Sequence, residues 1–246
     1  MRSSPPAVAA AAHTPPLPDP DPFDIPPTRG PSRPHVAPGG RSPRAAVIAG
    51  IVLAAGRSRR MGRPKPLLPF RGDTFLARVV RALREGGCEV VVAVVGPAED
   101  PVARRIAEEA ERAGARVAVN PRPEAEQVDS LRAGLAALPP ETEAAVVAPA
   151  DVPGIEAAAV RALVEAFRAR GAPVARATHG GAHGHPVLFA RGVFPELLAG
   201  PLPEGARTVV HAHAAEVEEV PVDLPEVLVD VDTPEDYRRL LEAEDG

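Results

Sequence analysis

Apolar residues follow two spacings from Ala45 onward, and the two spacings alternate along the chain. Uninterrupted apolar runs predict four strands that are buried on both faces, at residues 47–54, 88–95, 116–119 and 144–150. Leucine and valine at intervals of three and four predict helices, at residues 74–85, 101–113, 128–138 and 155–170. Buried strands joined by helices are typical of a parallel sheet with helices on both faces. We therefore expect one α/β domain over residues 45–246.

The alternation becomes irregular after Gly171. We expect strands around the loop HGGAHGH, then a helix and two more strands, at residues 174–178, 186–190, 207–214, 217–222 and 227–231. Thr233 should open a last helix, because Pro234 suits the first helical position and Asp236 follows three residues after the cap.

The first 44 residues differ in composition. They hold 13 of the 32 prolines, mixed with serine, glycine and aspartate, and they show no periodicity. Such a composition is typical of a disordered extension. The alternative is that translation starts downstream of this segment.

Charge and composition exclude several classes of protein. The net charge of −5 argues against general binding of nucleic acid, which requires a basic face. No apolar run approaches the roughly 18 residues of a membrane span. Cys88 is the only cysteine, so an internal disulfide is excluded and we expect a cytoplasmic protein.

The loop after the first strand, LAAGRSRRMGRPKPLLPF, holds Lys65, the only lysine among the 28 basic residues. Loops at the carboxyl ends of parallel strands bind ligands in open α/β sheets. Backbone amides near Gly56 and Gly62, together with fixed positive charge, suit a polyphosphate. The spacing matches neither a Walker A loop nor GxGxxG. A solvated basic surface loop is the alternative.

The motif LAAG-x-S-x-R-M-G-x-x-K-x-LLP-x-x-G, at residues 53–72, resembles the signature of molybdenum cofactor nucleotidyltransferases. SLRAGL, APADVP, GHPVLF, GAR and DVDTPED follow in the order of that family. The chain looks most like the molybdenum cofactor cytidylyltransferases, which use CTP. The related guanylyl-transferring branch, the molybdopterin-guanine-dinucleotide synthases, usually reads LAGG and carries asparagines in the last motif.

This resemblance implies a single Rossmann-like nucleotidyltransferase domain whose irregular C-terminal part completes the active site. It implies transfer of CMP from CTP to the phosphate of molybdopterin, with release of pyrophosphate and with Mg²⁺ as cofactor. The alternatives are another acceptor, such as phospholactate or a sugar phosphate, a non-catalytic cofactor-binding accessory protein, and a nicotinamide-dependent reductase. A molybdenum hydroxylase or its maturation chaperone is the protein partner that the resemblance suggests.

The resemblance also implies the catalytic residues, which are Lys65, Arg60 and Asp151. Lys65 would lie against the triphosphate, where a compact ammonium follows a moving phosphate better than a planar guanidinium does. Asp151 and Asp230 would hold the metal. Capping of the helix near residue 155 is the alternative role for Asp151.

Substrate-binding residues are implied in the same way. His185 and Asp232 would bind the acceptor, although Asp232 could equally support the turn into the last helix. Ser130 taken alone would more often be a helix N-cap. The nucleotide would contact Leu53, Ala54, Ala55, Gly56, Arg57, Gly62, Lys65 and Ser130.

Three residues depart from the family pattern. Glu126 stands where family members usually have glycine, and Asp129 where they have a small residue. Both acids would oppose an anionic ligand unless they point away or bind a cation. Gly154 replaces a common leucine.

Overall fold

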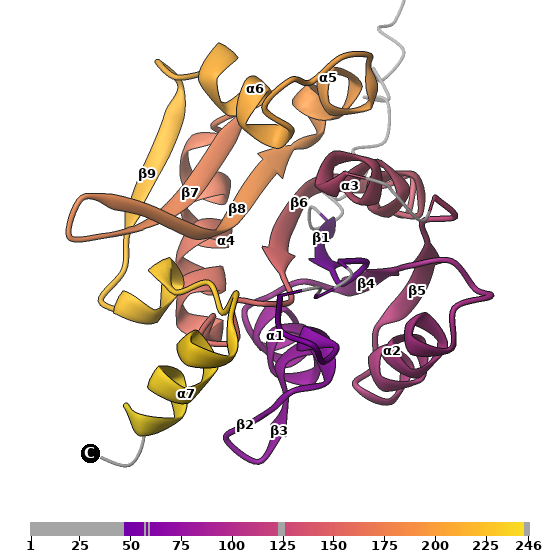
Figure 1. The fold of residues 1–246 in the computed structure, drawn as a ribbon. Coiled ribbons are helices and arrows are strands. Elements are labelled where there is room, and N and C mark those ends of the chain that lie inside the picture. Colours follow the sequence, from indigo (N-terminus) through magenta and orange to yellow (C-terminus); the bar gives the residue numbers. More distant parts are fainter. Residues whose placement is uncertain (1–46, 57, 59, 123–125, 244–246) are drawn as a thin grey trace, which may run out of the picture. The chain divides into compact units, whose positions relative to one another are not determined.

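A seven-stranded sheet forms the centre of the described part of the chain (Figure 1). The computed structural model describes residues 47–56, 58, 60–122 and 126–243, so the extension expected over residues 1–44 lies outside the described residues. The strands of the sheet are β1 Val47–Leu53, β4 Val90–Val95, β5 Arg116–Val119, β6 Thr142–Pro149, β7 Val174–His179, β8 Ala182–Ala190 and β9 Val217–Pro221. Their order across the sheet is β5-β4-β1-β6-β8-β7-β9.

Within this sheet, β8 is the strand that runs against its neighbours. It pairs antiparallel with β6 and with β7, whereas the other pairs are parallel. The mostly parallel sheet predicted from the sequence is therefore confirmed. Because β4, β1 and β6 run in one direction, the loops that follow them meet at the same edge.

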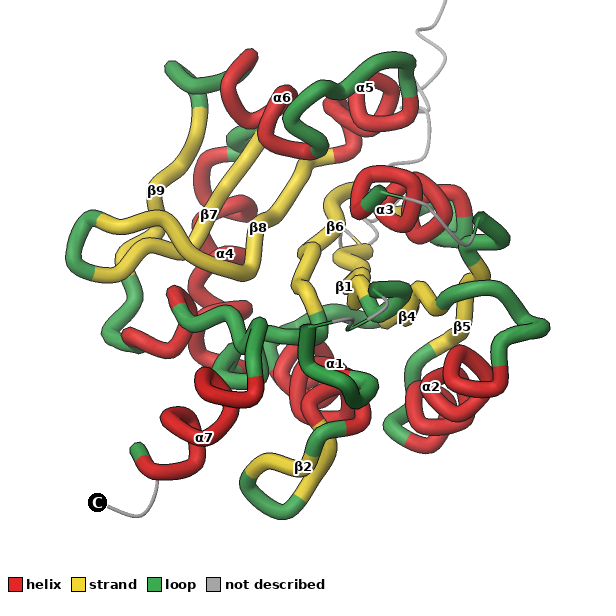
Figure 2. Tube along the Cα trace, in the orientation of Figure 1, coloured by secondary structure: helices red, strands yellow, loops and turns green. Residues whose placement is uncertain are grey.

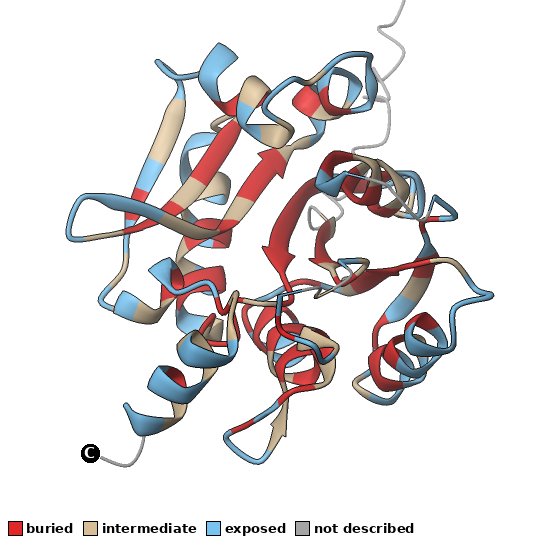
Figure 3. Cartoon of the chain, in the orientation of Figure 1, coloured by how far each residue is buried: buried red, intermediate tan, exposed pale blue. Residues whose placement is uncertain are grey.

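Helices cover both faces of the sheet, as expected (Figure 2). They are α1 Phe75–Glu85, α2 Pro101–Arg112, α3 Gln127–Ala136, α4 Ala157–Arg170, α5 Phe194–Leu198 and α6 Ala206–Ala212, whereas the last helix, α7 Pro234–Glu242, packs away from the sheet in a separate core. α1, α2 and α4 share a core with Ile48 and Val52 of β1, whereas α3, α5 and α6 share one with Ile51. Successive side chains of a strand point to opposite faces, so β1 supplies both cores. Figure 3 shows the central strands buried and the outer faces of the helices exposed. No helix among the described residues is long and apolar enough to cross a membrane.

Local capping chemistry sets the helix boundaries. α1 begins after Thr74, whose hydroxyl accepts a hydrogen bond from Ala77 N at 3.1 Å. α7 begins after Thr233, and Asp236 Oδ2 accepts from Thr233 N at 2.8 Å. The capping signal predicted at Thr233 is therefore confirmed.

Short elements between β1 and α1 were missed by the sequence pattern, because runs of two or three residues show no period. They are a 3₁₀ helix at Lys65–Leu67 and a hairpin of β2 Pro69–Phe70 with β3 Asp73–Thr74. Phe70 of this hairpin packs with Phe75 of α1 and Leu240 of α7 in a third, smaller core. The segment that carries Lys65 is thereby packed against the last helix.

The strand predicted at residues 227–231 was wrong. Pro225–Leu228 form a 3₁₀ helix, and the chain then passes the end of β6, where Val231 N donates to Asp151 O at 2.9 Å. Val227 and Val231 are fully buried, so the apolar pattern detected burial correctly. Burial alone does not distinguish a strand from a short helical turn.

HGGAHGH was expected to be a loop and is instead the end of a hairpin. Gly180 and Gly181 have φ of +57° and +81°, which suits a tight turn between antiparallel strands. β8 already begins at Ala182, so His183 and His185 lie in a strand.

Candidate functional site

A cavity of about 1280 Å³ opens at the carboxyl ends of β1, β4 and β6. Its walls come from the loop after β1, from Gly96 and Pro97 after β4, and from Asp151 after β6. Six of the residues predicted to contact the nucleotide line it: Leu53, Ala54, Ala55, Gly56, Gly62 and Ser130. Arg57, also predicted, lies outside the described residues.

Lys65 lines a smaller cavity of about 70 Å³, and Asp151 lines both cavities. The Lys65 side chain is 12% exposed. Its Nζ donates to Asp151 Oδ2 at 3.0 Å and to Asp232 Oδ1 at 2.6 Å. Burial opposes the charged form, but the hydrogen bonds and charges of Asp232 and Asp151 outweigh it, so the pKa of Lys65 is raised. The ammonium is therefore a stable cation at this edge of the sheet.

Ser58 organises the loop that carries Lys65. Its Oγ accepts from Lys65 N at 2.9 Å, and its carbonyl accepts from Met61 N at 3.0 Å and Gly62 N at 3.2 Å. Ser58 itself has a φ of +48°, a conformation that non-glycine residues adopt rarely. Sequence reasoning did not single out Ser58, although it is the serine of the LAAG-x-S motif.

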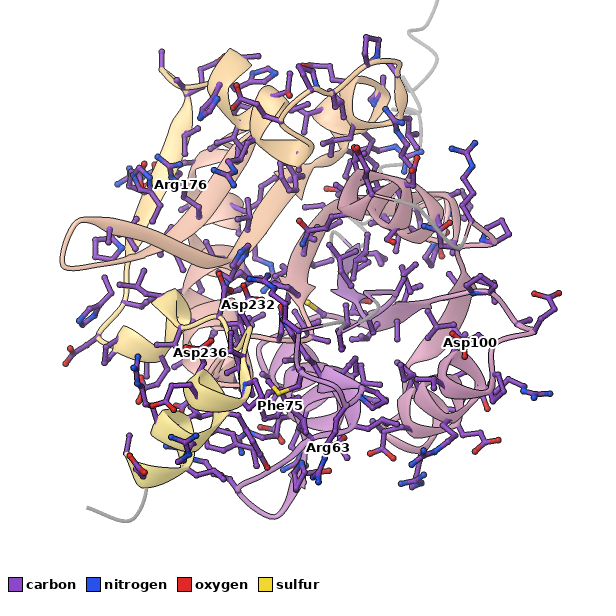
Figure 4. The ribbon with its side chains drawn as sticks, in the orientation of Figure 1. Arg63, Phe75, Asp100, Arg176, Asp232 and Asp236 are labelled. Atoms are coloured by element: carbon purple, nitrogen blue, oxygen red, sulfur yellow. The ribbon has the colours of Figure 1, made fainter. Side chains whose placement is uncertain are left out.

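Asp232 connects the C-terminal segment to this loop. Its Oδ1 accepts from Lys65, and its Oδ2 accepts from Arg60 Nη2 at 2.8 Å. The hydrogen bond from Lys65, aided by the charges of Lys65 and Arg60, lowers the pKa of Asp232. Asp232 N donates to Asp236 Oδ2 at 3.2 Å, so the cap of α7 also fixes Asp232. Figure 4 shows Asp232 near the centre of the view, beside the C-terminal segment that carries it.

His185 and Asp230 are electrostatically coupled to the same cluster. Burial lowers the pKa of His185 despite the charges of Asp230 and Asp151, which favours the neutral ring. The Nδ1 atom of His185 is buried and has no hydrogen-bond partner among the described residues. Loss of hydration raises the pKa of Asp230, and the charges of Asp151 and Asp232 add to this effect. Arg207, from the GAR motif, also acts on His185 and was not singled out beforehand.

The carboxylates of this cluster suit a divalent cation. The described residues contain no group of three or more His, Cys, Asp or Glu side chains that would form a closed metal site. Mg²⁺ does not need one, because waters and phosphate oxygens complete its coordination around one or two carboxylates. The negative charges of Asp151 and Asp232 repel that of Asp230, and a divalent cation would relieve this repulsion. Asp151 and Asp230 therefore fit a metal that arrives with phosphate.

Ser130 lies in the first turn of α3, and the N-cap is Glu126, so the capping role considered for Ser130 was wrong. Neither Glu126 nor Asp129 lines the cavity. Asp129 Oδ2 accepts from Glu126 N at 3.3 Å, and Asp129 Oδ1 lies 3.5 Å from Arg122 Nη1 and 3.8 Å from Arg132 Nη1. Asp129 is thus compensated by its own turn and by two arginines.

Comparisons with known proteins agree with this geometry. A family model described as MobA-like NTP transferase domain matches residues 50–217. The crystal structure of Rv0371c from Mycobacterium tuberculosis H37Rv is 34% identical with a TM-score of 0.69, over 80% of this chain and 99% of that one. A manganese complex of Rv0371c is 32% identical with a TM-score of 0.66, over 80% of this chain and 100% of that one.

Two curated relatives match shorter segments. A probable molybdenum cofactor guanylyltransferase from Opitutus terrae is 50% identical over 68 residues, which are 28% of this chain and 33% of that protein. A 2-C-methyl-D-erythritol 4-phosphate cytidylyltransferase from Saccharopolyspora erythraea is 40% identical over 92 residues, 36% of this chain and 39% of that protein. The chain thus matches between a third and two fifths of the length of these relatives. The family model, in contrast, covers most of the sheet, and so the chain belongs to the MobA-like NTP transferase domain family of nucleotidyltransferases.

Proposed function

We propose that this protein transfers CMP from CTP to the phosphate of a molybdopterin-type acceptor and releases pyrophosphate. The observation that carries the proposal is the position of Asp151, which lines both the large cavity and the small cavity of Lys65. A nucleotide bound along the loop after β1 would bring its phosphates to this junction.

The reaction joins two anions. An oxygen of the acceptor phosphate attacks the α-phosphorus of the triphosphate and forms a new P–O bond. The bond from the α-phosphorus to the oxygen shared with the β-phosphate breaks, and pyrophosphate leaves with that oxygen. The attacking phosphate is already ionised, so a strong general base is unnecessary. Catalysis then depends on positioning and on neutralisation of charge.

Lys65 would supply much of that neutralisation. Two unit charges about 4 Å apart interact by roughly 4 kcal/mol at an effective dielectric constant of about 20. The ammonium donates hydrogen bonds to Asp151 and Asp232. Phosphate oxygens would replace part of these contacts. Arg60, which donates a hydrogen bond to Asp232, would then also lie near the phosphates.

Asp151 and Asp230 would hold Mg²⁺, which when bound neutralises phosphate charge. The manganese complex of Rv0371c supports a divalent cation in this family. On the acceptor side, a polar group of the substrate would give His185 Nδ1 the partner that it lacks among the described residues.

CTP is the nucleotide we propose, because LAAG and DVDTPED are the forms that resemble the cytidylyl-transferring branch. The relative from Opitutus terrae is named as a guanylyltransferase, so GTP is the nucleotide to compare with CTP.

Pyrophosphate release by the purified protein tests the proposal. CTP, GTP, ATP and UTP are each supplied with Mg²⁺, with and without Mo-loaded molybdopterin. We expect release with CTP only when the pterin is present, and a strong decrease in the variant Asp151→Asn. The variant Arg161→Ala, at an exposed position of α4 where the guanidinium donates to Glu85 O, is the matched control and should keep full activity. A preference for GTP would correct the proposed nucleotide and leave the proposed acceptor unchanged. If the folded protein releases pyrophosphate with none of the four nucleotides, the proposal is overturned.

A further inference from the structure

Asn120 is a buried polar residue behind the wall of the large cavity. It follows β5 directly, is 3% exposed and does not line the cavity. Its Nδ2 donates to Ser130 Oγ at 3.0 Å. Ser130 is 5% exposed and does line the cavity. The Asn120 side chain therefore contacts the wall of the cavity through the side chain of Ser130.

The orientation of the Asn120 amide is fixed by its other contacts. Asn120 Oδ1 accepts from the backbone N of Arg122 at 3.2 Å. The backbone N of Asn120 donates to Val95 O at 2.8 Å, which holds the main chain in place. Since a backbone N–H must meet an acceptor, the amide oxygen faces Arg122 and the amide nitrogen faces Ser130. Ser130 Oγ therefore accepts a hydrogen bond, and its own hydroxyl hydrogen is not used in that contact.

We infer that Asn120 is a positioning residue that makes Ser130 a hydrogen-bond donor toward the nucleoside part of the bound nucleotide. The group that Ser130 recognises is then an acceptor, either a carbonyl oxygen or unprotonated ring nitrogen of the base, or an oxygen of the ribose. The inference rests on the proposed function, because it needs a nucleotide in this cavity. Asn120 would thus contribute to nucleotide specificity without contacting the ligand.

A competing partner for the Ser130 hydroxyl exists within α3. A serine inside a helix can donate to the carbonyl oxygen four residues earlier, which here belongs to Glu126. In that arrangement the hydroxyl would donate no hydrogen bond to the ligand, and removal of the hydroxyl would leave nucleotide affinity unchanged.

The substitution Asn120→Asp tests the direction of the bond. A carboxylate has nearly the same shape, keeps an acceptor for Arg122 N, and presents an acceptor instead of a donor to Ser130. The serine hydroxyl would then donate to Asp and be lost to the ligand. We expect the Kd of CTP with Mg²⁺, measured by titration calorimetry, to rise about fivefold in Asn120→Asp and in Ser130→Ala. The double variant should bind no more weakly than either single variant.

Inorganic tripolyphosphate with Mg²⁺ separates this effect from the added negative charge. A charge effect would weaken tripolyphosphate as much as CTP, whereas a contact with the nucleoside leaves the Kd of tripolyphosphate unchanged. Thr208→Ala, which removes a half-buried hydroxyl of α6 that accepts from Glu204 N at 3.1 Å, is the matched control and should bind CTP normally.

Three results would overturn the inference: an unchanged Kd in Asn120→Asp, losses that add in the double variant, or an equal loss for tripolyphosphate. If Asn120→Asp does not fold, Asn120→Ala takes its place, and there Ser130→Ala should have a smaller effect than in the wild type. If the wild type binds neither CTP nor GTP, the proposed function itself fails, and the role of Asn120 fails with it.

Discussion

The ammonium nitrogen of Lys65 lies 2.6 Å from Oδ1 of Asp232, although 167 positions separate the two residues in the chain. This contact joins the loop after β1 to the segment that precedes α7. Asp151, at the end of β6, completes the group with a 3.0 Å contact to the same nitrogen. Three distant parts of the sequence thus meet at one cation.

Replacement of Lys65 tests whether this cation acts on the reaction. We expect Lys65→Ala to lower kcat/KM for pyrophosphate release by roughly 10²- to 10³-fold, the usual loss when a charge-stabilising donor is removed. Lys65→Arg should recover little, because a planar guanidinium does not fit between two carboxylates as a compact ammonium does. Near-normal turnover in Lys65→Ala, with an unchanged circular dichroism spectrum, would contradict a catalytic role.

Much of the fold was predictable because its signals are local. The buried strands and α1 follow from the spacing of apolar residues, and the start of α7 follows from the capping chemistry of Thr233. The 3₁₀ helix at Pro225–Leu228 was not predictable, because Val227 is buried where this helix packs against β7 and β8, which are distant in the sequence.

The residues of the candidate site also fall into those that the sequence reveals and those that only the structure reveals. Lys65 and Asp151 could be named from motifs, since each follows a recognisable strand. Asn120 carries no motif, and only its contacts with Ser130 and Arg122 reveal its position. Ser58 was visible in the motif, but its role depends on backbone geometry that the sequence does not state.

The cap of α7 should contribute to stability. Thr233 Oγ1 accepts from Asp236 N at 3.2 Å. Thr233→Ala should lower the free energy of unfolding by about 1 kcal/mol, measured by urea denaturation. The same change should lower the transfer rate modestly, because α7 would hold Asp232 less firmly. An unchanged urea midpoint would mean that packing of Leu240 alone fixes the helix.

Gly154 should not tolerate a side chain. A Cβ at this position would clash with Cβ of Glu226. Gly154→Ala should lower the free energy of unfolding by about 1–3 kcal/mol, as overpacking does, and Glu226→Gly should recover part of the loss in the double variant. Gly192→Ala is the matched control, since nothing lies within 4 Å of a Cβ there. Equal denaturation midpoints for the two alanine variants would refute the clash.

His213 should make stability depend on pH. Its Nε2 lies 3.0 Å from Glu196 Oε1, and this contact, with help from Glu216, raises the pKa of His213 above 6.5. A group whose pKa is raised by folding stabilises the fold fully below the unfolded pKa, and that contribution is lost as the pH rises through the folded pKa. The Tm of the wild type should therefore fall from pH 6 to pH 8.5 more steeply than the Tm of His213→Gln. Glu196→Gln should flatten the profile in the same way, and parallel profiles for all three proteins would show that the ion pair does not contribute.

Cys88 should be unreactive in the native protein. It is 4% exposed, and burial raises the pKa of its thiol to about 12, so almost no thiolate forms at neutral pH. Because Cys88 is the only cysteine, reaction with 5,5′-dithiobis(2-nitrobenzoic acid) reports on this position alone. We expect one thiol to react rapidly in 6 M guanidinium chloride and almost none in native buffer over the same minutes.

Cys88 lies just after α1, where its backbone N donates to Leu83 O at 2.9 Å, so slow labelling in native buffer would measure local opening of this turn. Fast labelling without denaturant would mean that the turn between α1 and β4 is open in solution.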